Sequence, residues 1–141
     1  MELRASGEDY LEAVLILSQR LEHVRAIDVS NYLGFAKTSV SHGLGLLRQG
    51  GFLTRDSEGY LNLTELGRNM AENVYARHCF FTQWLMSAGV DPEIAERDAC
   101  RMEHTISEES FHKLIQALNH PMKPPEPGTG QEKQDSTNGL S

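Results

Sequence analysis

The sequence predicts a mainly α protein, in which an N-terminal winged helix-turn-helix is followed by a C-terminal helical dimerisation domain. Apolar residues recur at helical spacing through most of residues 6–118, whereas residues 52–63 alternate with period two. The alternating segment follows three short helical stretches, which is the order of elements in a winged helix. We therefore place the winged helix at residues 1–64, the helical domain at 65–120 and a disordered tail at 121–141.

Three short helices are expected before the alternating segment. The first covers residues 6–19, and Ser6 can cap it because a serine hydroxyl accepts a hydrogen bond from the free N–H groups of the first turn. The second covers residues 27–33 and closes at a glycine turn. The third covers residues 39–49, and Gly50-Gly51 ends it, since glycine enters the left-handed region without a steric penalty.

The alternating segment predicts a β-hairpin with a polar turn, and three more helices follow it. A long helix over residues 65–88 starts after a capping threonine. The next begins at Asp91-Pro92, because aspartate caps a helix and proline fits its first position, and it carries residues 100–104 near its end. Ser107 caps a last helix that ends near Leu118. The segment beyond is rich in proline and polar residues, which cannot form a core.

The composition is that of an ordinary soluble globular protein, with 39% hydrophobic and 23% charged residues. No stretch approaches the ~18 uninterrupted apolar residues of a transmembrane helix, and the first residues lack the profile of a signal peptide. We therefore expect a cytoplasmic protein, in which Cys79 and Cys100 are thiols.

The formal net charge of −7 argues at first against nucleic acid as a partner, but the charge is unevenly distributed. Residues 25–63 carry four basic and three acidic side chains, net +1, whereas residues 71–141 carry six basic and eleven acidic ones, net −5. The weak basicity of the winged helix predicts a modest intrinsic affinity for DNA. The acidic second half is the environment that a bound cation favours.

In a winged helix, the third helix enters the major groove of double-stranded DNA. Serine and threonine side chains there can bond phosphates or base edges, and the hairpin can meet the backbone or the minor groove. The candidate DNA-binding residues are Lys37, Thr38, Ser39, Ser41, His42 and Arg48 around the third helix, with Arg55 and Tyr60 on the hairpin. The alternative is that the fold serves only protein binding or dimerisation.

The segment 100–104 is the strongest indication of a metal site. On a helix, Cys100 lies one turn before Glu103 and His104, so a thiolate, a carboxylate and an imidazole project from one face. These groups are a soft, a hard and a borderline ligand for a divalent ion. The alternative is a helix with a buried cysteine and an exposed Glu-His pair.

Three other residues are candidate ligands. Asp9 and Glu12 share one face of the first helix at i, i+3 spacing, and His78 lies in the middle of the long helix. Each also has an ordinary structural explanation. Asp9 favours the helix dipole whether or not metal is present, Glu12 suits a solvated surface, and a single helical histidine is more often a surface or core residue.

Together these features resemble the DtxR/MntR family of metal-dependent transcriptional repressors, over about residues 5–118. The segments that carry the resemblance are Glu8-Asp9-Tyr10-Leu11-Glu12, Ala36-Lys37-Thr38-Ser39-Val40-Ser41, Arg77-His78 and Asp98-Ala99-Cys100-Arg101-Met102-Glu103-His104. The family fold is a winged helix followed by a helical dimerisation domain. The chain is similar to the short, manganese-type members, which lack the β-barrel of the iron-type members.

By position, the resemblance implies six metal ligands, namely Asp9, Glu12, His78, Cys100, Glu103 and His104. The two carboxylates on the first helix look like the manganese type, whereas Cys100 looks like the iron type. Thr82 and Glu96 stand where the iron type has a glutamate and a histidine of its second site. Carboxylates favour Mn(II) or Fe(II), and a thiolate favours Fe(II), Co(II) or Zn(II). We expect Mn(II) or Fe(II), with Zn(II) as the competitor.

The resulting hypothesis is a repressor of manganese or iron uptake genes that is activated by its metal. The ligands lie in both predicted halves, so the metal would clamp them together. The recognition helices of a homodimer would then be held at the ~34–36 Å spacing of successive major grooves. The alternative is a winged-helix regulator that responds to zinc or to no metal.

Two further expectations concern the class of protein and its assembly. An enzyme is not expected, because no nucleophile motif, phosphate loop or separate acid–base pair is visible. A homodimer is expected, because the long helix carries more apolar surface than one small domain can bury. The apolar residues in question are Phe80, Phe81, Trp84, Leu85, Phe111, Leu114 and Leu118.

Overall fold

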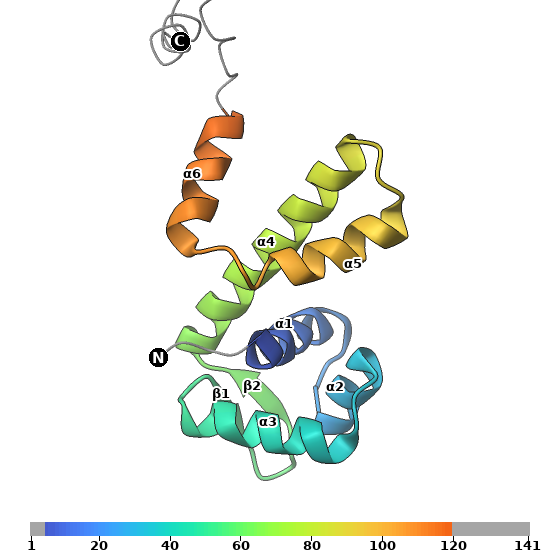
Figure 1. Cartoon of the computed structure of the whole chain (residues 1–141). Coiled ribbons are helices and arrows are strands. Elements are labelled where there is room, and N and C mark those ends of the chain that lie inside the picture. Colours follow the sequence, from blue (N-terminus) through green and yellow to red (C-terminus); the bar gives the residue numbers. More distant parts are fainter. Residues whose placement is uncertain (1–4, 120–141) are drawn as a thin grey trace, which may run out of the picture. The chain divides into compact units, whose positions relative to one another are not determined.

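The computed structural model describes residues 5–119, and within them the protein is mainly helical with one two-stranded sheet (Figure 1). The elements are α1 (Ala5–Arg20), α2 (Ala26–Leu33), α3 (Lys37–Gln49), β1 (Leu53–Arg55), β2 (Leu61–Leu63), α4 (Glu65–Ser87), α5 (Pro92–Met102) and α6 (Glu108–Asn119). The described residues form two compact units, which divide between Ile106 and Ser107. The tail expected at 121–141 lies outside the described residues, and the domain boundary at residue 64 stays a prediction.

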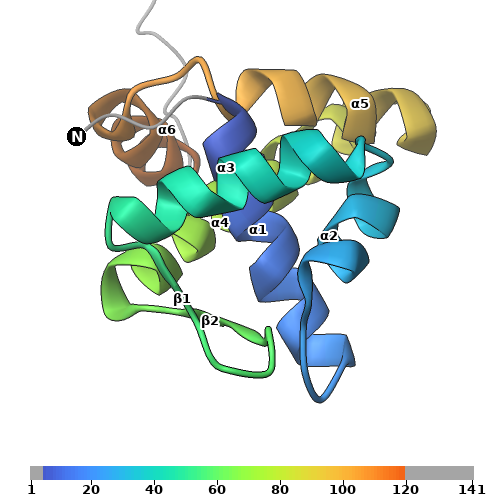
Figure 2. The ribbon, with the colours of Figure 1, turned by 90° about the horizontal axis from the view of Figure 1, so that it is seen from below.

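Helix α1 lies at the centre of the first unit, where it packs against α2, α3, α4 and β2 (Figure 2). Leu11, Val14 and Leu15 of α1 are at most 3% exposed. They share one hydrophobic core with apolar side chains of α2, α3, the hairpin and the start of α4. Helix α5 packs back against α4. This arrangement places α1 between α3 and the pair α4–α5.

The contact between α1 and α3 depends on a glycine. A Cβ atom added at Gly43 would overlap the ring of Tyr10, whereas one added at Gly45 would meet nothing within 4 Å. Tyr10 is only 6% exposed, and its ring also meets Phe35 edge to face at a centroid distance of 6.2 Å. The two helices can therefore approach closely only because residue 43 has no side chain.

The predicted hairpin is confirmed. Leu53 pairs with Leu63 and Arg55 with Leu61 in an antiparallel register. The side chain of Asp56 holds the turn, because its Oδ1 accepts hydrogen bonds from the backbone N–H groups of Glu58 and Tyr60, each at 2.9 Å. The backbone N–H of Leu61 also donates to the carbonyl of Val24 at 2.7 Å, which ties the α1–α2 connection to the wing.

Three predicted helix caps are confirmed. The side chain of Thr64 accepts a hydrogen bond from Gly67 N–H at 3.0 Å, that of Asp91 from Glu93 N–H at 3.3 Å, and that of Ser107 from Ser110 N–H at 3.1 Å. Each cap satisfies a backbone donor that the first turn of its helix leaves free.

Two predicted helix starts were wrong. Ser6 does not precede α1 but lies inside it, so its hydroxyl is not at the capping position. Helix α3 begins at Lys37, two residues before the predicted start at residue 39. It needs no side-chain cap, because Ala36 is extended and its carbonyl accepts the first helical hydrogen bond from Val40 N–H at 3.0 Å.

The apolar residues expected at a dimer surface divide into two kinds. Phe81 is 2% exposed and belongs to the interior of its own chain, whereas Trp84, one turn later on α4, is 42% exposed. In the second unit, Phe111 of α6 is buried and Leu118 is 43% exposed. Among residues 5–119, no helix has both the length and the apolar character needed to cross a membrane.

Candidate metal centre

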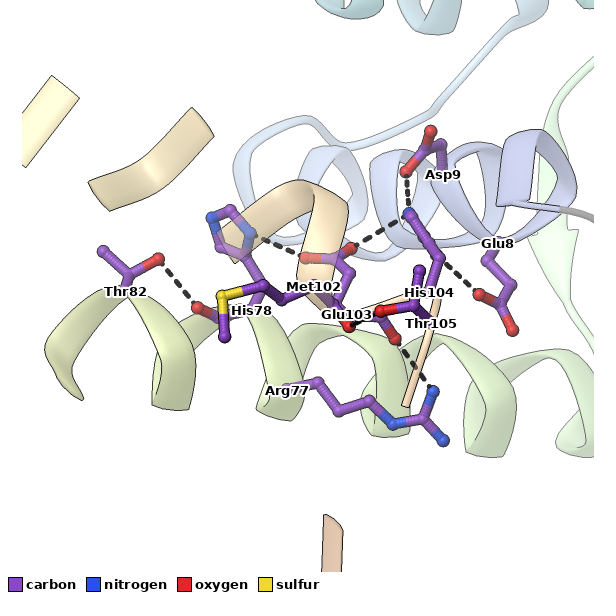
Figure 3. Close-up of polar contacts among 9 residues, drawn as sticks. All are labelled: Glu8, Asp9, Arg77, His78, Thr82, Met102, Glu103, His104 and Thr105. Atoms are coloured by element: carbon purple, nitrogen blue, oxygen red, sulfur yellow. Dashed lines mark hydrogen bonds and ion pairs between the residues drawn. The ribbon is translucent and has the colours of Figure 1, made fainter. Parts of the chain in front are cut away.

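The structure brings the six predicted ligands together in two groups that share one residue. Asp9, Cys100, Glu103 and His104 form the first group, and Glu12, His78 and Glu103 form the second. In each group, one ligand atom from every member lies within 4.8 Å of the others. Asp9 and Glu12 come from α1, His78 from α4, Cys100 from α5, and Glu103 and His104 from the turn after it. Figure 3 shows Asp9, His78, Glu103 and His104.

The end of α5 directs the last two ligands into the site. The structure brings Cys100, Glu103 and His104 together, although only Cys100 lies within α5, which ends at Met102. Glu103 keeps a helical backbone and donates its N–H to Ala99, after which Thr105 donates both its N–H and its hydroxyl to the carbonyl of Met102. His104 follows Glu103 in this turn and lies beside α1, where its ring contacts Glu8 and Asp9.

His104 bridges the turn to α1 with both ring nitrogens. Its Nε2 lies 2.8 Å from Oδ1 of Asp9 and 3.4 Å from Oε2 of Glu103. Its Nδ1 lies 2.6 Å from Oε1 of Glu8. Hydrogen bonds between two carboxylates and an imidazole favour the charged ring and raise the pKa of His104 to about 10, against the opposing effect of burial.

Glu103 is the buried centre of the arrangement, with no exposed surface. Its Oε1 lies 2.8 Å from Nδ1 of His78, and its backbone carbonyl accepts a hydrogen bond from Nη1 of Arg77 at 3.1 Å (Figure 3). Its Oε2 is also buried and forms no hydrogen bond within the described part of the chain. A buried carboxylate oxygen in this condition is costly, and a cation would offset that cost.

Without a cation, the ionised forms of Glu12 and Cys100 are also electrostatically unfavourable. Burial, followed by the nearby charge of Glu103, raises the pKa of Glu12 to about 8. The same two causes raise the pKa of the Cys100 thiol to about 11. The pKa of His78 is raised by its hydrogen bond to Glu103, against its burial. The site therefore holds protons on several groups that could all donate electron pairs to a metal.

The donor set fits a divalent transition ion. Glu8, Asp9, Glu12 and Glu103 supply four carboxylates around two imidazoles, and Cys100 adds a thiol. Oxygen and nitrogen donors suit Mn(II) and Fe(II), and a sulfur donor extends the range to Zn(II). Asp9, Glu12, His78, Cys100 and His104 also line an open cleft of roughly 1300 Å³, so an ion can reach them from solvent. Thr82 and Glu96 line the same cleft.

Sequence reasoning missed one functional candidate, Glu8. It was noted only as part of a segment, yet its carboxylate contacts His104 directly. Its i, i+4 spacing from Glu12 is the signal that could have indicated it, whereas i, i+1 spacing does not predict that Glu8 and Asp9 meet the same group. Only the position of His104 between them reveals that both residues reach one ring.

The candidate DNA-binding residues lie on one side of the winged helix. Lys37, Thr38, Ser39, Ser41, His42 and Arg48 of α3 and Arg55 of β1 are all exposed, and α3 lies along the outside of the unit (Figure 2). Tyr60 is half-buried. Its ring stacks on His23 at a centroid distance of 4.1 Å, and the guanidinium carbon of Arg25 lies 4.8 Å from its centroid. Its exposed neighbours His23 and Arg25 therefore cover much of the ring.

A winged helix joined to a helical pair by clustered carboxylates, imidazoles and a thiol defines a winged-helix protein with a candidate metal centre. Residues 64–129 match the family described as "Iron dependent repressor, metal binding and dimerisation domain". The transcriptional regulator MntR of Salmonella typhimurium is 33% identical over 108 residues, which cover 77% of this chain and 69% of MntR. The chain belongs to the DtxR/MntR family of metal-dependent transcriptional regulators.

Two longer metal-dependent regulators are also similar to this chain. The iron-dependent repressor IdeR of Mycobacterium tuberculosis is 28% identical over 125 residues, which cover 88% of this chain and 54% of IdeR. The solved structure of the manganese regulator SloR matches with a TM-score of 0.73 and 25% identity, over 84% of this chain and 56% of SloR. The chain thus spans little more than half the length of these two relatives.

Proposed function

We propose that the protein is a DNA-binding repressor of manganese or iron uptake genes that becomes active when Mn(II) or Fe(II) binds between α1 and the α4–α5 pair. The observation that carries the proposal is the buried Glu103, shared by two groups of ligand-type side chains from three helices and one turn. The family membership supports the regulatory role. A repressor of this kind would act in the cytoplasm, where its operator lies.

The two oxygens of Glu103 support a paired arrangement of ions. Oε1 faces His78 at 2.8 Å, and Oε2 faces His104 at 3.4 Å. Asp9, Cys100 and His104 would complete one site on the Oε2 side, and Glu12 would complete the other on the Oε1 side. Glu103 would then be a bridging carboxylate. The raised pKa values of Glu12 and His104 mean that protons occupy this region until metal displaces them.

The bound metal supplies positive charge that allows the clustered carboxylates to be ionised together. Asp9 and Glu12 then hold α1, while His78, Cys100, Glu103 and His104 hold the α4–α5 pair. Helix α1 carries Tyr10 against Gly43 of α3, so fixing α1 also restricts the recognition helix. A metal that binds preferentially to this conformer increases its population, and DNA must in turn tighten metal binding.

DNA recognition in this proposal uses the exposed face of α3 and the wing. Lys37, Arg48 and Arg55 would neutralise phosphates, while Thr38, Ser39, Ser41 and His42 would bond phosphates or base edges. Tyr60 would act mainly as a support for His23 and Arg25. A homodimer would present two such helices to a pseudo-palindromic operator, and the exposed Trp84 is a candidate for its interface.

The test is an operator-binding assay with Mn(II), Fe(II), Zn(II) or chelator. Mn(II) or Fe(II) should tighten binding to the operator. His104→Ala should abolish that response, although the variant should still fold in the presence of chelator. Glu72→Ala, at an exposed position on α4, is the control and should respond like the wild type. A response to Zn(II) alone would support the zinc-responsive alternative. Equal DNA affinity in every metal and in chelator would exclude metal sensing.

A further inference from the structure

Glu8 contacts the candidate metal centre without belonging to either ligand group. Its Oε1 lies 2.6 Å from Nδ1 of His104, although the two residues are 96 positions apart in the chain. The Glu8 side chain is 14% exposed and that of His104 is 10% exposed, so the contact is largely protected from water. Such a short separation indicates a charge-assisted hydrogen bond.

The two nitrogens of the His104 ring face different surroundings. Nε2 faces the ligand groups, at 2.8 Å from Asp9 and 3.4 Å from Glu103. Nδ1 faces Glu8 on the other side of the ring (Figure 3). A metal held by Asp9 and Glu103 can therefore meet only Nε2, and Nδ1 must then carry the remaining proton.

We propose that Glu8 is a positioning residue for the metal centre: its carboxylate accepts the Nδ1–H of His104 and so directs the Nε2 lone pair at the metal. This inference rests on the proposed function, because it assigns a role in the same site. A carboxylate behind a metal-bound imidazole fixes the tautomer and the ring orientation and makes the ligand more basic. Glu8 also adds a third contact from α1 to the metal-binding side.

The contact makes a directional prediction about variants. Glu8→Ala removes the acceptor and should weaken Mn(II) binding roughly 10- to 100-fold, the usual range for such partners. Glu8→Gln keeps an oxygen acceptor but loses the charge, so its affinity should lie between those of wild type and Glu8→Ala. Glu72→Ala removes an exposed carboxylate from α4 and should bind Mn(II) as the wild type does. This series separates the hydrogen bond from general charge effects.

The experiment measures Mn(II) affinity of the full chain by competition with a chelating dye, for wild type, the three variants and His104→Ala. Zn(II), which is diamagnetic, is then used for nitrogen NMR of His104. In wild type and Glu8→Gln, Nε2 should be the metal-bound nitrogen, and Nδ1–H should exchange slowly with water. In Glu8→Ala that proton should exchange rapidly. Thermal unfolding in chelator establishes that each variant is folded.

The outcomes separate the two proposals. If wild type binds Mn(II) tightly, His104→Ala binds weakly and Glu8→Ala binds like wild type, the role of Glu8 is refuted while the metal centre stands. Binding of Zn(II) through Nδ1 would also refute it. If wild type and His104→Ala bind Mn(II) equally, the metal centre fails and the role of Glu8 fails with it. Graded weakening from Glu8→Gln to Glu8→Ala, with slow Nδ1–H exchange, supports the proposal.

Discussion

At the scale of single residues, Glu103 shows how the site stores unfavourable charge. It is fully buried, it lies between two histidines, and its Oε2 has no hydrogen bond among residues 5–119. Glu12 is 8% exposed, and its burial, together with the nearby charge of Glu103, raises its pKa. An interaction of this kind reduces the stability of the metal-free protein and is relieved when a cation binds.

Replacing Glu103 by glutamine should therefore separate stability from metal binding. Above about pH 8, where Glu12 is also ionised, the neutral amide removes the repulsion with Glu12 while its oxygen can still accept a hydrogen bond from His78, so the free energy of unfolding in chelator should remain equal to that of wild type or rise. Mn(II) affinity should fall at least about 100-fold, because both ligand groups lose their shared carboxylate. Urea unfolding in chelator and a Mn(II) titration measure the two quantities. A marked loss of stability in chelator would contradict this account of Glu103.

The raised pKa values also predict how stability depends on pH. Folding raises the pKa of Glu12 from 4.5 to about 8 and that of His104 from 6.5 to about 10. The folded protein thus binds more protons than the unfolded chain between about pH 4.5 and pH 10, so metal-free stability should fall as pH rises through this window. Urea unfolding at a series of pH values, in chelator, measures the trend. In His104→Ala, stability should depend less on pH at the high-pH end of this window. A rise in wild-type stability with pH would contradict the raised pKa values of Glu12 and His104.

At the scale of elements, α1 connects the candidate metal centre to α3, the proposed recognition helix. Its Asp9 and Glu12 contribute to the two ligand groups, while Tyr10 packs on Gly43 of α3. Asp9 and Tyr10 are adjacent in sequence, so a change in the position of α1 reaches both sides. The packed core around Leu11 and Val14 makes α1 rigid enough to carry such a change.

Gly43→Ala tests this connection. The added Cβ must displace the ring of Tyr10, and overpacking of this kind costs about 1–3 kcal/mol of stability. Gly45→Ala is the matched control on the same helix, where nothing lies within 4 Å, and the better helix propensity of alanine should stabilise it by up to about 1 kcal/mol. Urea unfolding compares the two variants. Equal effects at both positions would show that the contact with Tyr10 is unimportant.

At the scale of the whole molecule, the proposed function requires that metal and DNA act on one conformational equilibrium. If metal increases DNA affinity by a given factor, operator DNA must increase metal affinity by the same factor. The effect would be confined to the conformer in which α1, α4 and α5 bring the ligand-type side chains together. The phosphate contacts of the weakly basic winged helix would by themselves give only a modest, salt-dependent affinity for DNA. The metal-bound conformer would add to that affinity.

Stabilisation by Mn(II) and proton release on metal binding can be compared between wild type and Asp9→Ala. Mn(II) at 100 times its dissociation constant should raise the stability of wild type by about 2.7 kcal/mol. Titrations in buffers with different ionisation enthalpies should show proton release, because metal displaces protons from Glu12 and His104. Asp9→Ala should reduce both effects at the same Mn(II) concentration. Stabilisation without proton release would mean that the ion binds elsewhere.

The order of elements and the identity of the ligand-type residues followed from the sequence, because both depend on local signals. Helical spacing, the caps at Thr64 and Asp91 and the Asp56–Gly59 turn act within a few residues. The start of α3 and the end of α5 were harder to predict, since Ala36 gives no capping signal and α5 ends at Met102 without a glycine or proline there.

Only the tertiary structure decided how the groups meet. The contact of Glu8 with His104 joins residues 96 apart, and the approach of Tyr10 to Gly43 joins two helices, so neither has a local signal. The burial of Glu103 between two histidines likewise depends on how α1, α4 and α5 pack. Residue types and spacing determined which side chains could bind a metal, whereas long-range packing determined their distances, their protonation and the nitrogen of His104 that faces the site.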